Sequence, residues 1–72
     1  MQDRVDARGL SCPQPVLMAL SKMREMKSGN LEVLVDNEVS KENVCRAAAK
    51  EGWEITDLKR ESDEYSLLLA KP

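Results

Sequence analysis

The sequence predicts a two-layer α/β sandwich in which strands and helices follow the order βαβαββ. Two segments with helical periodicity, 13–28 and 40–52, each lie between short segments where apolar and polar residues alternate. A third and a fourth alternating segment close the chain, separated by the polar run 61–64. Because strand–helix–strand crossovers are right-handed, we expect both helices on one sheet face, with the other face largely exposed to water.

The first strand is expected over residues 3–7 and the first helix from Pro13 to about Ser28, where Gly29-Asn30 supplies a stop. Val5 and Ala7 should face the core. In the helix, the apolar positions that share one side are Val16, Ala19, Leu20, Met23 and Met26, with Leu17 at the edge.

Met18 falls on the opposite, polar side of the same helix. Two interpretations stay open for this residue. It is either a singly exposed apolar side chain, which is common on protein surfaces, or part of a docking surface for partners.

The second strand is expected over 31–36, with its odd-numbered apolar residues on one face, and a polar turn follows it. Ser40 is predicted to cap the second helix, with Val39 and Val44 forming a hydrophobic staple. Gly52 is predicted to end that helix in a Schellman-type turn that packs Trp53 back on the helix. The buried side of the helix should consist of Val44, Ala47 and Ala48, with Cys45 at its edge as a packing residue.

The third strand is expected over 53–60 and the fourth over 65–70, paired as an antiparallel hairpin. In the third strand Trp53 and Ile55 should share one face. A bend could turn Leu58 to either face. In the fourth, Tyr65, Leu67 and Leu69 should share one face.

Length and composition limit the class of protein. Seventy-two residues indicate one small domain, residues 1–72. The net charge of −2 argues against direct binding of nucleic acid, because the protein's electrostatic field would not attract phosphate groups. No apolar run is long enough to cross a membrane and no signal peptide is visible, so we expect a cytoplasmic protein.

The absence of histidine excludes a Cys-His nucleophile pair, a Ser-His-Asp triad and a histidine metal site. Cys12 and Cys45 are too far apart in the sequence for a Cys-x-x-Cys redox motif, and two cysteines cannot form an all-cysteine zinc site within one chain. We therefore expect no metal and no cofactor. A Cys12–Cys45 disulfide stays open as an alternative.

The most informative stretch is the loop between the first strand and the first helix. Arg8-Gly9 turns the chain, and Pro13 is a favourable first helical residue, which makes Cys12 the expected N-cap. The helix dipole and the free amides of Cys12 and Gln14 should hold the Cys12 thiol pKa below its ordinary value of about 8.5. Arg8 either adds positive potential near the sulfur or orients the turn.

Pro15 removes a second amide from the same helix end. It also requires Gln14 to be helical, which is an unfavourable conformation for a residue that precedes proline. A local conflict beside an exposed nucleophile favours a functional interpretation. On this view, replacing Pro15 by alanine would leave the fold unchanged or slightly more stable.

The run from Asp6 to Pro15, with its Gly-Leu-x-Cys-Pro-x-Pro pattern, resembles the signature of the TusA/SirA-like family of small sulfur-carrier proteins. The resemblance covers nearly the whole chain. It implies a mixed four-stranded sheet with strand order 1-2-4-3 and a persulfide carried on Cys12. Arg8, Gly9, Pro13, Gln14 and Pro15 would support that site.

The resemblance implies a carrier in a sulfurtransferase relay rather than a stand-alone enzyme. It would act as a monomer with two protein partners, a sulfur donor such as a cysteine desulfurase and a sulfur acceptor. The segments 35–39 and 42–44 look more like the N-terminal domain of YedF-type proteins, which are linked to selenium metabolism. Candidate pathways are therefore tRNA thiolation, cofactor assembly and selenium metabolism.

Two other classes of function stay open. The Cys-Pro-x-Pro segment could shape the docking loop of a non-catalytic interaction or regulatory module. Alternatively, a low-pKa thiol would suit a redox sensor that forms sulfenic acid.

Overall fold

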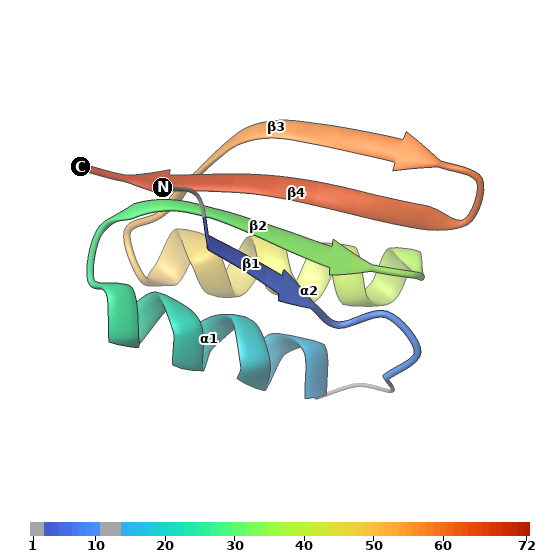
Figure 1. Cartoon of the computed structure of the whole chain (residues 1–72), viewed down its shortest axis with the longest axis horizontal. Helices are drawn as coiled ribbons and strands as arrows, with labels where there is room; N and C mark the ends of the chain where they lie inside the picture. The colour runs from blue at the N-terminus through green and yellow to red at the C-terminus, as the bar shows by residue number, and fades with distance from the viewer. Residues whose placement is uncertain (1–2, 11–13) are drawn as a thin grey trace.

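The computed structural model describes residues 3–10 and 14–72. The elements follow the predicted order (Figure 1): β1 (Asp3–Asp6), α1 (Gln14–Met26), β2 (Gly29–Val35), α2 (Glu38–Lys50), β3 (Glu54–Glu61) and β4 (Glu64–Lys71). No helix in these two ranges has the length and apolarity that a membrane span requires.

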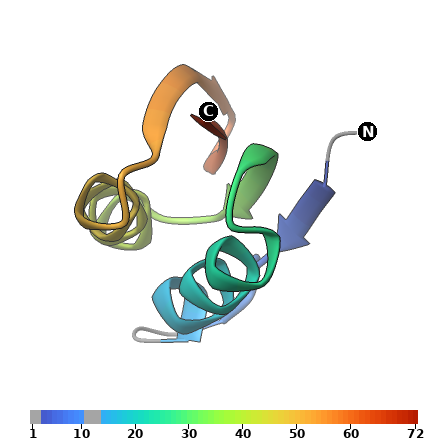
Figure 2. The same ribbon diagram turned by 90° about the vertical axis from the view of Figure 1, so that its left-hand side faces the viewer.

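The four strands form one mixed sheet in the order β1-β2-β4-β3. β1 and β2 are parallel, as expected of strands joined through a helix, whereas β2–β4 and β3–β4 are antiparallel. Both helices lie on the same side of the sheet (Figure 2). The predicted two-layer α/β sandwich is confirmed.

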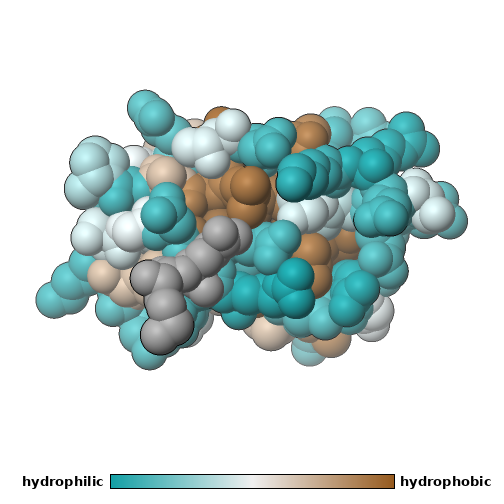
Figure 3. Space-filling model, turned by 45° about the horizontal axis from the view of Figure 1, so that its top comes forward, coloured by the Kyte–Doolittle hydropathy of each residue, from teal (hydrophilic) through white to brown (hydrophobic). Residues whose placement is uncertain are grey.

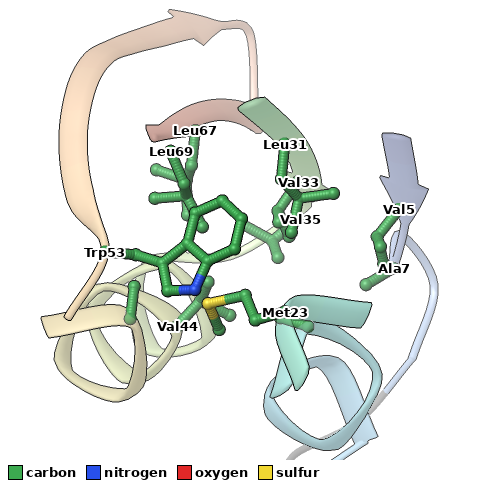
Figure 4. Close-up of a cluster of buried hydrophobic side chains, with 12 residues drawn as sticks. Val5, Ala7, Met23, Leu31, Val33, Val35, Val44, Trp53, Leu67 and Leu69 are labelled. Atoms are coloured by element: carbon green, nitrogen blue, oxygen red, sulfur yellow. The ribbon is translucent and has the colours of Figure 1, made fainter. Parts of the chain in front are cut away.

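The core lies between the sheet and the two helices. The predicted alternation in β2 and β4 is confirmed, because Leu31, Val33, Val35, Leu67 and Leu69 are buried. Figure 4 shows the Trp53 ring between the β2 and β4 side chains and those of the helices. Among the described residues, the buried hydrophobic cluster consists of Val5, Ala7, Ala19, Met23, Leu31, Val33, Val35, Val44, Ala48, Trp53, Leu67 and Leu69.

The end of α1 differs from the prediction. The helix stops at Met26 rather than near Ser28, because Lys27 adopts a left-handed conformation with φ of 68°. The Lys27 amide still donates to the Met23 carbonyl at 2.9 Å. Gly29, which was expected to stop the helix, is already the first residue of β2.

The start of α2 also differs. The N-cap is Asn37 rather than Ser40, because the Asn37 side-chain oxygen accepts the Ser40 amide at 2.8 Å. Ser40 is therefore inside the first turn, where it is buried, and its hydroxyl has no hydrogen-bond partner among the described residues. The predicted staple with Val44 is wrong, because Val39 is 61% exposed.

The end of α2 follows the prediction. Gly52 has φ of +83°, which favours glycine, and its amide donates to the Ala49 carbonyl at 3.2 Å. The Trp53 amide donates to the Ala48 carbonyl at 2.9 Å. These two bonds form a Schellman motif, and Trp53 enters the core directly after it.

β3 is an edge strand, and every one of its residues is exposed. A β-bulge between Ile55 and Asp57 shifts the pairing with β4, so that Ile55 pairs with Leu69 and Leu58 with Leu67. Directly paired residues lie on the same face, so the bulge turns Leu58 to the helix side together with Ile55. Leu58 is nevertheless 45% exposed.

The face of the sheet opposite the helices is open to solvent and carries a polar network. Glu32 on β2 accepts from Arg4 Nε on β1 at 2.8 Å and from Ser66 Oγ on β4 at 2.7 Å. These two hydrogen bonds, with that from Ser66 the larger cause, lower the pKa of the Glu32 carboxyl. Figure 3 shows hydrophilic side chains dividing the apolar areas of the surface seen from above the hairpin.

Candidate functional site

The loops after β1 and β2 lie at the same end of the sheet. Because these strands are parallel and each is followed by a helix, both α1 and α2 begin at that end (Figure 1). Helix N-termini carry partial positive charge and unpaired amides, so this end of the molecule favours negative charge. The predicted site lies in the loop that leads into α1 at Gln14.

Asp36 joins the two loops. Its Oδ2 accepts the Gly9 amide at 2.6 Å, and its Oδ1 accepts from Asn37 Nδ2 at 3.2 Å. Gly9 has φ of +78° with open space where a side chain would be, so backbone conformation rather than crowding favours glycine there. The acidic turn after β2 therefore anchors the loop that precedes Cys12 in the sequence.

Arg8 is held between two carboxylates. Its guanidinium donates to both oxygens of Asp6, at 2.9 and 2.8 Å, and to Glu64 Oε1 at 3.1 Å. The hydrogen bonds from the Arg8 side chain and backbone lower the pKa of Asp6 to about 2. The same side-chain contacts, with that to Asp6 the larger cause, raise the pKa of Arg8.

This geometry favours one of the two interpretations of Arg8. Two carboxylates offset its charge locally, so its contribution to the positive potential around the loop is reduced. Its contacts instead fix the turn against β1 and against the start of β4. We therefore interpret Arg8 as the residue that orients the turn.

Pro15 is buried, whereas Gln14 beside it is exposed. Pro15, Ala19 and Met23 follow at helical spacing and form the buried side of α1. The expected stripe began at Val16, which is only half-buried. The (i, i+4) spacing of Pro15 from Ala19 is the signal in the sequence that places Pro15 on this buried side. The predictions for Cys12 and Pro13 lie outside the described residues.

Leu17 and Met18 form an exposed apolar surface on the first turns of α1. Leu17 is 58% and Met18 40% exposed, and both line a hollow between α1 and β1. Leu17 is more exposed than its expected position at the edge of the stripe implied. A docking role for Met18 stays a proposal.

Cys45 lies on α2 at the edge of the core and is a half-buried free thiol. Burial, the largest cause, raises the pKa of this thiol, which lowers its reactivity near neutral pH. These features fit the packing role expected of Cys45. In the part of the chain that the structure describes, no three His, Cys, Asp or Glu side chains are grouped as metal ligands.

Comparison with known proteins gives consistent matches along the chain. A family model described as "Sulfurtransferase TusA" matches residues 3–71. A putative sulfur carrier protein of Archaeoglobus fulgidus is 31% identical over 68 residues, which cover 93% of this chain and 93% of the relative. The sulfur carrier protein TusA of Allochromatium vinosum is 32% identical over 68 residues, which cover 93% of this chain and 90% of the relative.

A solved structure has the same fold. The crystal structure of the SirA-like protein from Desulfitobacterium hafniense matches with a TM-score of 0.85 and 29% identity, covering 97% of this chain and 96% of that one.

Proposed function

The chain belongs to the TusA sulfurtransferase family, and from this premise we propose that it is a sulfur carrier that holds persulfide sulfur on Cys12. The observation that carries the proposal is the place of this cysteine in the chain. Only Pro13 separates Cys12 from Gln14, where α1 begins, and the turn before it is anchored through Arg8 and Gly9. A thiolate near the start of a helix is stabilised by the helix dipole and is the reactive form of cysteine.

The chemistry requires one nucleophilic sulfur and no metal. The Cys12 thiolate attacks the outer sulfur of a donor persulfide, a new S–S bond forms, and the donor cysteine leaves as a thiolate. An acceptor nucleophile then attacks the outer sulfur on Cys12, and the Cys12 thiolate leaves. No net oxidant or reductant is consumed in either transfer.

This chemistry places the protein between two protein partners, a sulfur donor such as a cysteine desulfurase and a sulfur acceptor. We propose that it works as a monomer in the cytoplasm, in tRNA thiolation, cofactor assembly or selenium metabolism. The likeness of segments 35–39 and 42–44 to YedF-type proteins favours the selenium pathway as the first to examine.

The proposal is tested by incubating the protein with a cysteine desulfurase and cysteine and measuring its intact mass without reductant. We expect the wild type and Cys45→Ser to gain one sulfur atom that dithiothreitol removes, and Cys12→Ser to gain none. Serine retains N-cap capacity, so Cys12→Ser should change the free energy of unfolding by less than about 1 kcal/mol.

Other outcomes would contradict the proposal. Sulfur uptake that depends on Cys45 would place the carrier residue on α2. Oxygen gained under peroxide, with no sulfur gained from the desulfurase, would indicate a redox sensor. Gain of neither atom would leave a non-catalytic interaction module.

A further inference from the structure

The outer surface of the helical layer has a groove between α1 and α2 that the site above does not use. Its volume is about 390 Å³, and apolar side chains line it from both helices: Val16 and Leu20 from α1 and Ala47 from α2. Val16 and Leu20 pack on the core from one side and remain only half-buried. The groove thus offers an apolar strip along two helices of 13 residues each.

The rim of this groove is cationic, although the whole chain has a net charge of −2. Arg24, Arg46 and Lys50 line it together with a single carboxylate, Glu51. Arg24 Nε contacts Glu51 Oε1 at 3.3 Å, so this carboxylate is already paired. Arg46 and Lys50 are exposed on successive turns of α2 and form no ion pair with any described residue.

We propose that this groove docks an amphipathic helix of a partner protein whose apolar stripe is flanked by carboxylates. The inference rests on the proposed sulfur-carrier function and deepens it by naming the chemistry of one relay partner. A helix laid along a groove between two helices buries apolar residues at i, i+3 or i+4 and i+7. Its flanking acidic residues would face Arg46 and Lys50, which is the charge complementarity that selects an acidic helix over a basic one.

The position of the groove fits a partner that acts at Cys12. Val16, at the first turn of α1, follows Cys12 by four residues in the sequence. The groove lies on the outside of the helical layer, whereas the turn at Arg8 is anchored to the start of β4 through Glu64. A helix bound in the groove would therefore lie beside the first turn of α1, which follows Cys12 in the sequence, without using the contacts that hold the turn at Arg8.

The test is an NMR titration of the full chain, uniformly labelled with ¹⁵N, at low ionic strength. The probe is a stapled helical peptide of about fifteen residues with leucines on one face and glutamates beside them, a length that spans the groove. A second peptide carries lysine in place of each glutamate. We expect the acidic peptide to shift amide signals of groove residues such as Leu20 and Ala47, and the basic peptide to leave them unchanged.

Matched single variants separate the groove from general charge. Arg46→Glu should weaken binding of the acidic peptide by about tenfold, because an attraction becomes a repulsion. Lys59→Glu changes the net charge equally, but on the exposed strand β3 outside the groove, and should leave the affinity within about twofold. Both side chains are exposed, so both variants should fold.

Several results would overturn the groove proposal: no shifts with the acidic peptide, shifts confined to the open sheet face, equal binding of the basic peptide, or concentration-dependent dimerisation that places a second copy in the groove. Sulfur uptake from the desulfurase is measured on the same samples. If sulfur loads on Cys12 while the peptide does not bind, the groove proposal alone fails. If the peptide binds in the groove while Cys12 takes up no sulfur, the docking surface stands and the sulfur-carrier proposal fails.

Discussion

At the scale of single residues, carboxylates in the candidate site hold one backbone amide and one guanidinium group. Asp36 holds the Gly9 amide, and Asp6 and Glu64 hold the Arg8 guanidinium. Pro15 has a double role that its position alone does not reveal. It removes an amide from the start of α1, and its ring is also buried in line with Ala19.

The burial of Pro15 reverses the stability expected for its replacement. Pro15→Ala removes ring atoms from the core and makes the unfolded chain more flexible, and both effects lower the free energy of unfolding, by about 1–2 kcal/mol in total. Urea unfolding followed by circular dichroism measures the change. Gln14→Ala, at an exposed neighbour, is the control and should change stability by less than about 0.5 kcal/mol. Equal stability of Pro15→Ala and wild type would show that the ring contributes no packing energy.

At the scale of elements, the helix ends determine how the chain passes between layers. At the end of α2, the backbone amides of Gly52 and Trp53 donate to carbonyl groups of the last helical turn, and the Trp53 side chain enters the core. Lys27 ends α1 in a left-handed conformation that is uncommon for a residue other than glycine. Asn37 caps α2 and also donates a hydrogen bond to Asp36. The cap of this helix is therefore linked to the carboxylate that holds the Gly9 amide.

The identity of the α2 cap can be tested by a pair of alanine substitutions. Asn37→Ala removes the acceptor of the Ser40 amide and should lower the free energy of unfolding by about 1 kcal/mol. Ser40→Ala removes a buried hydroxyl without a described partner, so stability should be unchanged or higher by up to about 1 kcal/mol. Thermal unfolding of the two variants side by side measures the difference. A larger loss for Ser40→Ala than for Asn37→Ala would assign the cap to Ser40.

At the scale of the whole molecule, the two helices cover the strands unequally. The apolar residues Leu31, Val33 and Val35 of β2 and Leu67 and Leu69 of β4 are buried under the helices, whereas all of β3 is exposed at the edge of the sheet. Leu67 and Leu58 illustrate the difference, because they are direct pairing partners on one face. Leu67 is fully buried and Leu58 is 45% exposed.

This difference in burial predicts that replacing leucine by alanine lowers the free energy of unfolding by different amounts at the two positions. Leu67→Ala should lower the free energy of unfolding by about 2–5 kcal/mol, because it leaves a cavity in a small core. Leu58→Ala, at a partly solvated edge position, should cost less than about 1 kcal/mol. Chemical denaturation with tryptophan fluorescence is a suitable measurement, since Trp53 lies in the same core. Similar losses in the two variants would show that β3 is packed as tightly as β4.

Features that depend on local chemistry could be predicted from the amino-acid sequence. The alternation in β2, the glycine that ends α2 at Gly52 and the order of the elements follow from side-chain periodicity and allowed backbone angles, which neighbouring residues set. The position of Cys12 within Cys-Pro-Gln-Pro is likewise a property of the sequence, and its structural role stays a prediction.

Options that are locally equivalent are distinguished only by the backbone conformation of the folded chain and by contacts between residues that are distant in the sequence. Asn37 and Ser40 are both good caps, and in the folded chain the extended backbone of Asn37, with its side chain accepting the Ser40 amide, makes Asn37 the cap. Arg8 obtains its second carboxylate from Glu64, 56 residues away, so no local pattern could reveal that its charge is offset. The burial of Pro15 likewise depends on how α1 packs against the sheet, because burial is a property of the surrounding layers rather than of the residue.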